Sequence, residues 1–188
     1  RLFSLVRLWY DGHSVNGART ITVQIRDAVL LRPIFQDYEM TAIFTVPVSL
    51  SERSYEIVIQ AGLLARLGKR LKEHGVGGKV AIVTDRHVAR HYLKSSLEAI
   101  KRYGIEPIPI ILTPGERSKT LKTVEQILDV LARHRFERSS MVVALGGGVV
   151  GDMAGFAASI YQRGIPYIQV PTTLVAQVDS SVGGKTGV

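Results

Sequence analysis

The residues best suited to chemistry lie in the second half of the sequence, and the densest group is a glycine run. Leu145 is followed by Gly146-Gly147-Gly148-Val149-Val150-Gly151-Asp152, which fits the pattern G-x-G-x-x-G. An apolar stretch at 141–145 predicts a strand before the glycines, and a helix is expected to follow them. Glycines let the backbone turn tightly and approach a pyrophosphate, whose charge is stabilised by free N–H groups at a helix start. A turn whose glycines serve packing alone is the alternative.

An acidic residue for a ribose is missing where a standard dinucleotide site has one, about 20 positions after the glycines. The sequence has Pro171-Thr172-Thr173 there. Asp85, directly after the apolar stretch 79–84, is the candidate for ribose hydroxyls instead. It also precedes a helix expected from about His87, so an N-cap is the favoured interpretation, and both roles can hold together.

Two further loops carry charged groups that suit a phosphorylated ligand. In the loop 114–120, Glu116 is placed to accept from ribose hydroxyls and Lys119 to meet a phosphate, but for this loop taken alone a plain loop with a capping residue is the favoured interpretation. The segment 179–186 ends like a Walker A loop, but Asp179 stands where that motif needs a glycine. What remains is Asp179 and Lys185 around a glycine turn, which suits a carboxylate beside a phosphate-binding cation.

The histidines and cysteines argue against metal and thiol chemistry. His87 and His91 are spaced i, i+4, which suits metal binding on one helix face, yet no third ligand lies nearby. We therefore predict exposed helix residues and no metal site. The sequence has no cysteine, which excludes disulfides, Cys-based zinc sites and thiol catalysis and fits a cytoplasmic protein.

The formal charge of +8 raises the question of a nucleic-acid partner. The basic residues are spread over helix faces, with no run of five and no interleaved aromatic residues, so an anionic small molecule is the favoured partner. No apolar run reaches the roughly 20 residues of a membrane span, and the start lacks the layout of a secretory signal.

The loops must be positioned by strands and helices that alternate from about residue 45. Alternating segments at 46–50 and 55–59 predict a β-hairpin. After it, apolar stretches typical of buried strands at 79–84, 108–112, 141–145 and 167–170 alternate with helical patterns at 63–71, 87–103, 121–134 and after the glycines. The sequence predicts an α/β fold with a Rossmann-like parallel sheet, helices on both faces and a preceding hairpin. Such sheets bind ligands at the carboxyl ends of their strands.

Residues 1–44 do not join this alternation. The stretch 21–25 is consistent with a strand, but the segment shows no chemistry. We divide the chain into an unassigned N-terminal extension, 1–44, and an α/β domain, 45–188. The chain begins with Arg1 and ends at Val188 next to a glycine motif, which suggests a truncated domain.

The order of the motifs resembles the 3-dehydroquinate synthase family of sugar-phosphate cyclases. The resemblance covers about residues 45–188. Its motifs are the hairpin end 53–57, the loop 114–120, the glycine run 146–152, Tyr161-Gln162-Arg163-Gly164, and the long segment 169–188.

This resemblance implies a tightly held NAD and conversion of 3-deoxy-arabino-heptulosonate 7-phosphate to 3-dehydroquinate and phosphate in the shikimate pathway. By motif, Asp179 would bind a substrate hydroxyl, Lys185 the substrate phosphate, and Arg163 a neighbouring subunit's phosphate, which implies a homodimer. The residues expected to hold NAD are Asp85, Glu116, Lys119, Gly147, Gly148, Val149, Val150, Gly151, Asp152, Thr172, Thr173 and Lys185.

The family also has a helical, metal-binding second domain, which we expect to be absent here because the zinc or cobalt ligands would lie beyond Val188. The chain alone is therefore expected to lack cyclase activity. Alternatives are another sugar-phosphate cyclase, such as a valiolone or inosose type, an iron-type alcohol or glycerol dehydrogenase, or a non-catalytic NAD-binding module.

Overall fold

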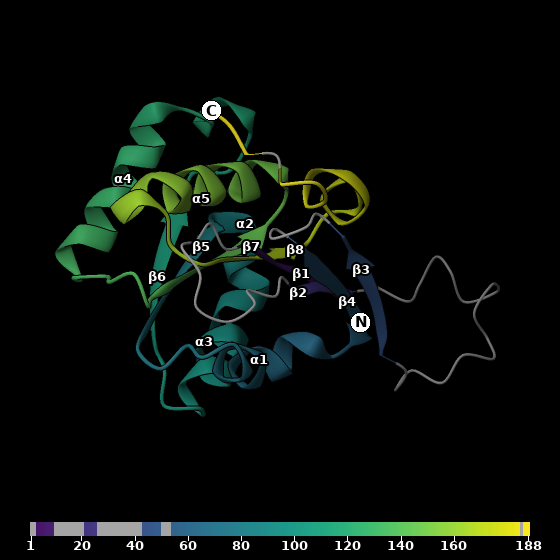
Figure 1. The fold of residues 1–188 in the computed structure, drawn as a ribbon. Helices are drawn as coiled ribbons and strands as arrows, with labels where there is room; N and C mark the ends of the chain where they lie inside the picture. The colour runs from purple at the N-terminus through teal and green to yellow at the C-terminus, as the bar shows by residue number, and fades with distance from the viewer. Residues whose placement is uncertain (1–2, 10–20, 26–42, 50–53, 185) are drawn as a thin grey trace.

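The four apolar stretches after residue 75 form the parallel sheet that the sequence predicts (Figure 1). The computed structural model describes residues 3–9, 21–25, 43–49, 54–184 and 186–188. The parallel strands are β5 (Lys79–Asp85), β6 (Glu106–Leu112), β7 (Met141–Gly146) and β8 (Tyr167–Pro171). They lie in the order β6-β5-β7-β8. The chain therefore moves from β5 to one side and then crosses to the other, which creates a switch point between β5 and β7.

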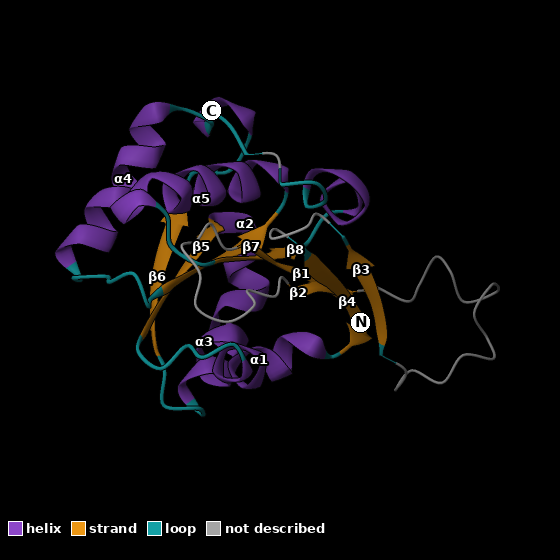
Figure 2. Cartoon of the chain, in the orientation of Figure 1, coloured by secondary structure: helices purple, strands orange, loops and turns teal. Residues whose placement is uncertain are grey.

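Helices cover both faces of this sheet, as predicted (Figure 2). The first face carries α1 (Leu67–Glu73), reached through a 3-10 turn at Leu63–Arg66, and α3 (Lys94–Lys101). The other face carries α4 (Leu121–Arg133) and α5 (Gly148–Ile160). Side chains of β5 alternate between the layers: Val80 and Ile82 pack with α1 and α3, whereas Ala81 and Val83 pack with α4 and α5. Burial on both faces explains why β5, β7 and β8 are largely apolar, whereas β6 at the edge of the sheet has exposed positions.

The hairpin expected before the sheet is also present. Its strands are β3 (Phe44–Val48) and β4 (Tyr55–Ala61), which pair antiparallel. Two more strands come from the N-terminal segment: β1 (Phe3–Trp9) and β2 (Ile21–Ile25). β2 confirms the strand expected at 21–25, whereas β1 was not predicted. β1 pairs antiparallel with β8 and β4, so one sheet of eight strands runs β3-β4-β2-β1-β8-β7-β5-β6.

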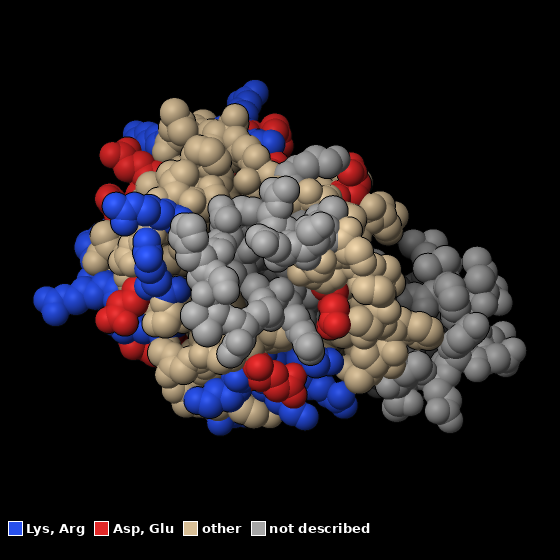
Figure 3. Space-filling model, in the orientation of Figure 1, with Lys and Arg blue, Asp and Glu red and all other residues tan. Residues whose placement is uncertain are grey.

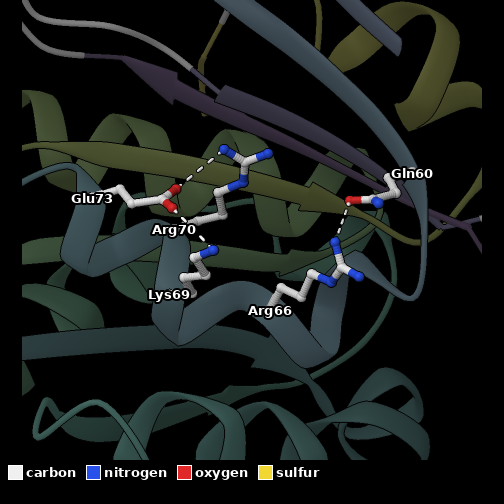
Figure 4. A network of polar contacts seen from close by, with 5 residues as sticks. All are labelled: Gln60, Arg66, Lys69, Arg70 and Glu73. Carbon is white, nitrogen blue, oxygen red and sulfur yellow. Dashed lines mark hydrogen bonds and ion pairs between the residues drawn. The ribbon is translucent and has the colours of Figure 1, made fainter. Parts of the chain in front are cut away.

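Basic residues on α1 and on the 3-10 turn before it form local polar contacts (Figure 4). Lys69 and Arg70 lie 3.7 and 3.2 Å from the two carboxylate oxygens of Glu73, and Arg66 donates to Gln60 at 3.4 Å. On the face shown in Figure 3, Lys and Arg occupy several separate places with Asp and Glu among them. Within the described ranges, no helix is both long and apolar enough to cross a membrane.

Candidate functional site

The strand register places four sequence motifs along one edge of the sheet. In the pairing of β5 with β6, Asp85 lies opposite Leu112, and in that of β7 with β8, Gly146 lies opposite Pro171. Asp85, the loop 114–120, the glycine turn and the Thr172–Thr173 pair therefore all follow the carboxyl ends of neighbouring strands. This is the edge at which parallel sheets bind ligands, and β5 and β7 flank its switch point.

The glycine turn opens α5 without a capping side chain. Gly147 is the N-cap, and the first helical bond runs from the N–H of Gly151 to the carbonyl of Gly147 at 3.0 Å. The N–H groups of Gly148, Val149 and Val150 therefore precede the first helical donor, Gly151, and carry the positive end of the helix dipole. An anion is the complement of that end. The N–H of Gly151 is already bonded within the helix.

Packing also requires these glycines. A Cβ on Gly146 would lie 2.6 Å from the Val150 side chain, and one on Gly147 would lie 3.1 Å from a Thr173 methyl group. One on Gly148 would lie 2.9 Å from the Ser180 hydroxyl oxygen. The two interpretations of the glycine run are therefore compatible, since close packing brings the segment after β8 against the start of α5.

Asp85 is the N-cap that the sequence favours. Its carboxylate accepts from the N–H of His87 at 2.8 Å and of Val88 at 3.0 Å, at the start of α2 (Arg86–Val88). α2 continues through a π-helical turn at Ala89–Leu93 into α3. Both bonds are made by Oδ1, so a role in holding a ribose would fall to the other oxygen.

An ion pair joins the loop 114–120 to α5. Lys119 lies 2.7 Å from Asp152 and 4.0 Å from Glu116, and the Lys119 and Asp152 side chains are 26% and 19% exposed. The hydrogen bond to Asp152 raises the pKa of Lys119, burial opposes it to a smaller extent, and the negative charges of Asp152 and Glu116 add to the rise. The structure thus brings together three residues that the sequence assigned to one ligand.

Buried hydroxyls lie beside the glycine turn. Within the described part of the chain, the side-chain oxygens of Thr84, Thr172 and Ser180 are buried and have no hydrogen-bond partner. The N–H of Thr172 donates to the Gly146 carbonyl at 2.9 Å, which ties the end of β8 to the turn. Thr173 instead caps the next turn by accepting from the N–H of Ala176 at 3.2 Å. Ser180 was not among the sequence candidates because nothing in its spacing distinguishes it from Ser181.

The segment after Thr173 continues as a π-helical turn at Ala176–Ser180, which the sequence did not predict. Asp179 belongs to this turn and is exposed. Lys185, the predicted phosphate-binding cation, lies outside the described residues. Gly183 donates through its N–H to the Tyr55 hydroxyl at 2.9 Å, which anchors the segment on β4.

Arg163 lies at the opposite edge of the sheet. It follows the C-terminus of α5 and precedes Tyr167, which pairs with Val142 at the beginning of β7. The 13 residues of α5 span about 20 Å and separate Arg163 from the glycine turn. Arg163 and Gln162 both have left-handed backbones, with φ of 68° and 49°. Within one chain, this arginine does not join the other candidates.

No group of three metal-binding side chains occurs among the residues that the structure describes. His87 and His91 are both exposed, and the His91 ring lies 6.0 Å from that of Tyr92. The histidine pair therefore has the surface position that the sequence analysis favours.

Comparison with known proteins matches the same region. Residues 109–188 match the family model described as 3-dehydroquinate synthase N-terminal. The 3-dehydroquinate synthases of Nitrobacter hamburgensis and Brucella ovis are 51% and 50% identical to this chain over 144 residues, 77% of the chain and 38% of each relative. The matched region belongs to the 3-dehydroquinate synthase family. The chain spans about two fifths of the length of these relatives.

Solved structures of related cyclases share the fold. A 2-epi-5-epi-valiolone synthase from Streptomyces hygroscopicus, solved with NAD+ and Zn2+, is 32% identical, with a TM-score of 0.65 over 75% of this chain and 39% of that protein. A 2-deoxy-scyllo-inosose synthase is 25% identical, with a TM-score of 0.68 over 77% of this chain and 41% of that protein. The sequence prediction of the fold and of the family is thus confirmed.

Proposed function

We propose that this chain is the NAD-binding part of a 3-dehydroquinate synthase. The observation that carries the proposal is the convergence of four sequence motifs at the switch-point edge, in a chain that is 51% identical to such a synthase over 77% of its length. The residues there suit a dinucleotide: an uncapped helix start for the pyrophosphate, a carboxylate at the end of β5 for a ribose, and buried hydroxyls in need of partners.

Each candidate would have a distinct task in this site. The N–H groups at the start of α5 would hold the pyrophosphate, Asp85 and Glu116 would accept from ribose hydroxyls, and Lys119 would add positive charge. Since Asp152 neutralises much of that charge at 2.7 Å, we expect Lys119 to orient the ligand more than to attract it. The cofactor residues proposed together are Asp85, Glu116, Lys119, Gly147, Gly148, Val149, Val150, Gly151, Asp152, Thr172, Thr173 and Lys185.

The reaction proposed for the complete enzyme converts 3-deoxy-arabino-heptulosonate 7-phosphate to 3-dehydroquinate and phosphate. Bound NAD supplies a reversible hydride transfer, which makes a neighbouring C–H acidic. This chain would contribute Asp179, accepting a hydrogen bond from a substrate hydroxyl, and Lys185, binding the substrate phosphate. A cytoplasmic location stays a prediction from the sequence.

Arg163 suits a role in a second subunit's site. About 20 Å of helix separates it from the phosphate-binding turn of its own chain, so we propose that it reaches the substrate phosphate of a partner in a homodimer. The turn that carries it is fixed: Arg138 donates to the Gln162 carbonyl at 3.3 Å, and Tyr161 and Gln162 both donate to the Phe136 carbonyl.

The divalent metal expected for the family has no fitting ligand set among the described residues, so we derive no step through it. We infer that the 188-residue chain alone forms no 3-dehydroquinate. Sustained release of phosphate from the heptulosonate phosphate by the purified chain, followed spectroscopically, would contradict this inference.

Titration of the chain with NAD+ by calorimetry tests the proposal. We expect saturable binding by the native chain and at least tenfold weaker binding by Gly148→Ala, whose Cβ would displace Ser180 and crowd the helix start. Gly77→Ala is the matched control, because a Cβ there has nothing within 4 Å. Absence of NAD+ binding by the folded native chain would refute the proposal.

A second candidate function is another sugar-phosphate cyclase, favoured by the 32% identity to the valiolone synthase. The test uses a protein that joins this region to the remaining length of its relatives. Formation of 2-epi-5-epi-valiolone in place of 3-dehydroquinate would support this function. NAD+ binding with neither activity would indicate a non-catalytic module.

A further inference from the structure

The Ser180 hydroxyl occupies a position that the proposed cofactor residues do not account for. Its oxygen is buried and has no hydrogen-bond partner within the described part of the chain. The residues on either side, Asp179 and Ser181, both interact with other groups. A buried hydroxyl without a partner destabilises the fold, and a bound ligand that accepted its hydrogen bond would offset that cost.

The backbone conformation directs Ser180 toward α5. The turn Ala176–Ser180 is π-helical and closes with the N–H of Ser181 donating to the Ala176 carbonyl at 3.0 Å. Such wide turns recur at functional sites. The result is that the Ser180 oxygen lies 2.9 Å from the place of a Cβ on Gly148, at the first helical residue of α5.

Donors of two kinds therefore meet at the start of α5. The N–H groups of Gly148 to Val150 precede the first helical donor, Gly151, and the Ser180 hydroxyl oxygen lies beside the Cβ position of Gly148. Thr172, whose hydroxyl is also buried and unpartnered, is bonded through its N–H to Gly146 in the same turn. Donors without acceptors call for a group that is rich in acceptor oxygens and negatively charged, which a phosphate provides.

We propose that the Ser180 hydroxyl donates a hydrogen bond to a pyrophosphate oxygen of the dinucleotide bound at α5. This inference rests on the proposed NAD function and adds a residue to it. Ser180 is a binding residue, and Gly148 is required partly because a side chain there would push this hydroxyl away. The segment after β8 thus contributes to the phosphate site, whereas the loop that carries Lys119 follows β6, at the other end of the four parallel strands.

Calorimetry with two ligands tests the proposal on the 188-residue chain. We expect Ser180→Ala to weaken binding of NAD+ about tenfold and of ADP-ribose to the same extent, because both ligands carry the pyrophosphate and one charged hydrogen bond is lost. Ser159→Ala is the matched control: it removes a part-buried hydroxyl at the far end of α5, where Ser159 donates to the Phe156 carbonyl at 2.7 Å. That variant is expected to bind both ligands like the native chain.

The outcomes separate this inference from the proposed function. If the native chain binds NAD+ and Ser180→Ala binds it equally well, the role of Ser180 is refuted while the proposed function stands. A loss for NAD+ alone, without a loss for ADP-ribose, would move Ser180 to the nicotinamide end and overturn the phosphate assignment. If the native chain binds no NAD+, both the role of Ser180 and the proposed function are refuted. Should Ser180→Ala melt below the titration temperature, Ser180→Cys fills the same place with a slightly larger group that is a weak donor, and it is expected to show the same loss.

Discussion

The Asp85 carboxylate illustrates how one residue can serve both structure and binding. Oδ1 satisfies two N–H groups at the start of α2, so the sequence preference for an N-cap was correct. The ribose role requires the remaining oxygen, which the cap does not use. Because an amide side chain caps a helix about as well as a carboxylate does, the two roles can be separated by substitution.

We predict that Asp85→Asn leaves the free energy of unfolding within about 0.5 kcal/mol of the native value, since the amide oxygen still accepts at the cap. The same variant is expected to bind NAD+ several-fold more weakly, because the amide can place a donor where the ribose hydroxyls need an acceptor. Asp85→Ala should weaken NAD+ binding as well, and it should lower the free energy of unfolding by about 1 kcal/mol because the helix cap is removed. Urea unfolding and calorimetry measure the two effects. Equal NAD+ affinity for the native chain and Asp85→Asn would remove Asp85 from the site.

The ion pair between Lys119 and Asp152 gives a pH-dependent prediction. The pair raises the pKa of Lys119, so its contribution to stability is complete below the ordinary lysine value of about 10.4 and is lost as the pH rises through the higher folded-state value. We expect Lys119→Met to lower the free energy of unfolding by less than about 1 kcal/mol at pH 8, because both groups are partly exposed. By pH 12 the difference from the native chain should shrink. Urea unfolding at each pH measures this difference. A difference that grows with pH would contradict a stabilising ion pair between Lys119 and Asp152.

At the scale of elements, the strands and helices after residue 54 can be predicted from the spacing of apolar residues and from the glycines and capping residues at their ends. The stretch 79–84 is continuously apolar because β5 is buried between two helix layers, and that pattern is sufficient to predict it. The π-helical turn Ala176–Ser180 has no such signal, because its width depends on contacts with α5 and β4 that lie far away in the sequence. For the same reason the sequence indicated Asp179 as a site residue and overlooked Ser180.

The contact between α1 and α3 gives an element-scale prediction. A Cβ on Gly68 would lie 2.2 Å from the Ala99 carbonyl oxygen and 2.9 Å from the Ile100 Cα. Both atoms belong to the backbone of α3, which cannot move without disturbing its packing on the sheet. We expect Gly68→Ala to cost about 1–3 kcal/mol in unfolding free energy. Gly77→Ala serves again as the control, and equal urea midpoints for the two variants would show that α1 and α3 separate easily.

At the scale of the whole molecule, the question is how the N-terminal segment relates to the α/β domain. β1 completes the hydrogen bonding of β8 at the edge of the parallel strands, and β1 and β2 both pair with β4. Among the described side chains, the two large apolar clusters around the parallel sheet begin only at Val58. The proposed site residues also all follow β5 or later strands. The sheet order places β1 between β8 and the strands β2 and β4, so the division at residue 44 stays a prediction from the sequence.

We therefore predict that a chain lacking residues 1–42 still unfolds cooperatively and binds NAD+ within about twofold of the native affinity, because the helix layers and binding loops stay in place. The edge of β8 would lose its pairing with β1 over Arg7 to Trp9, and an exposed strand edge promotes association. Sedimentation equilibrium should accordingly show more self-association by the shortened chain. Loss of the cooperative transition or of NAD+ binding would make β1 and β2 integral to the domain, because the clusters that begin at Val58 would then be insufficient to hold the parallel sheet.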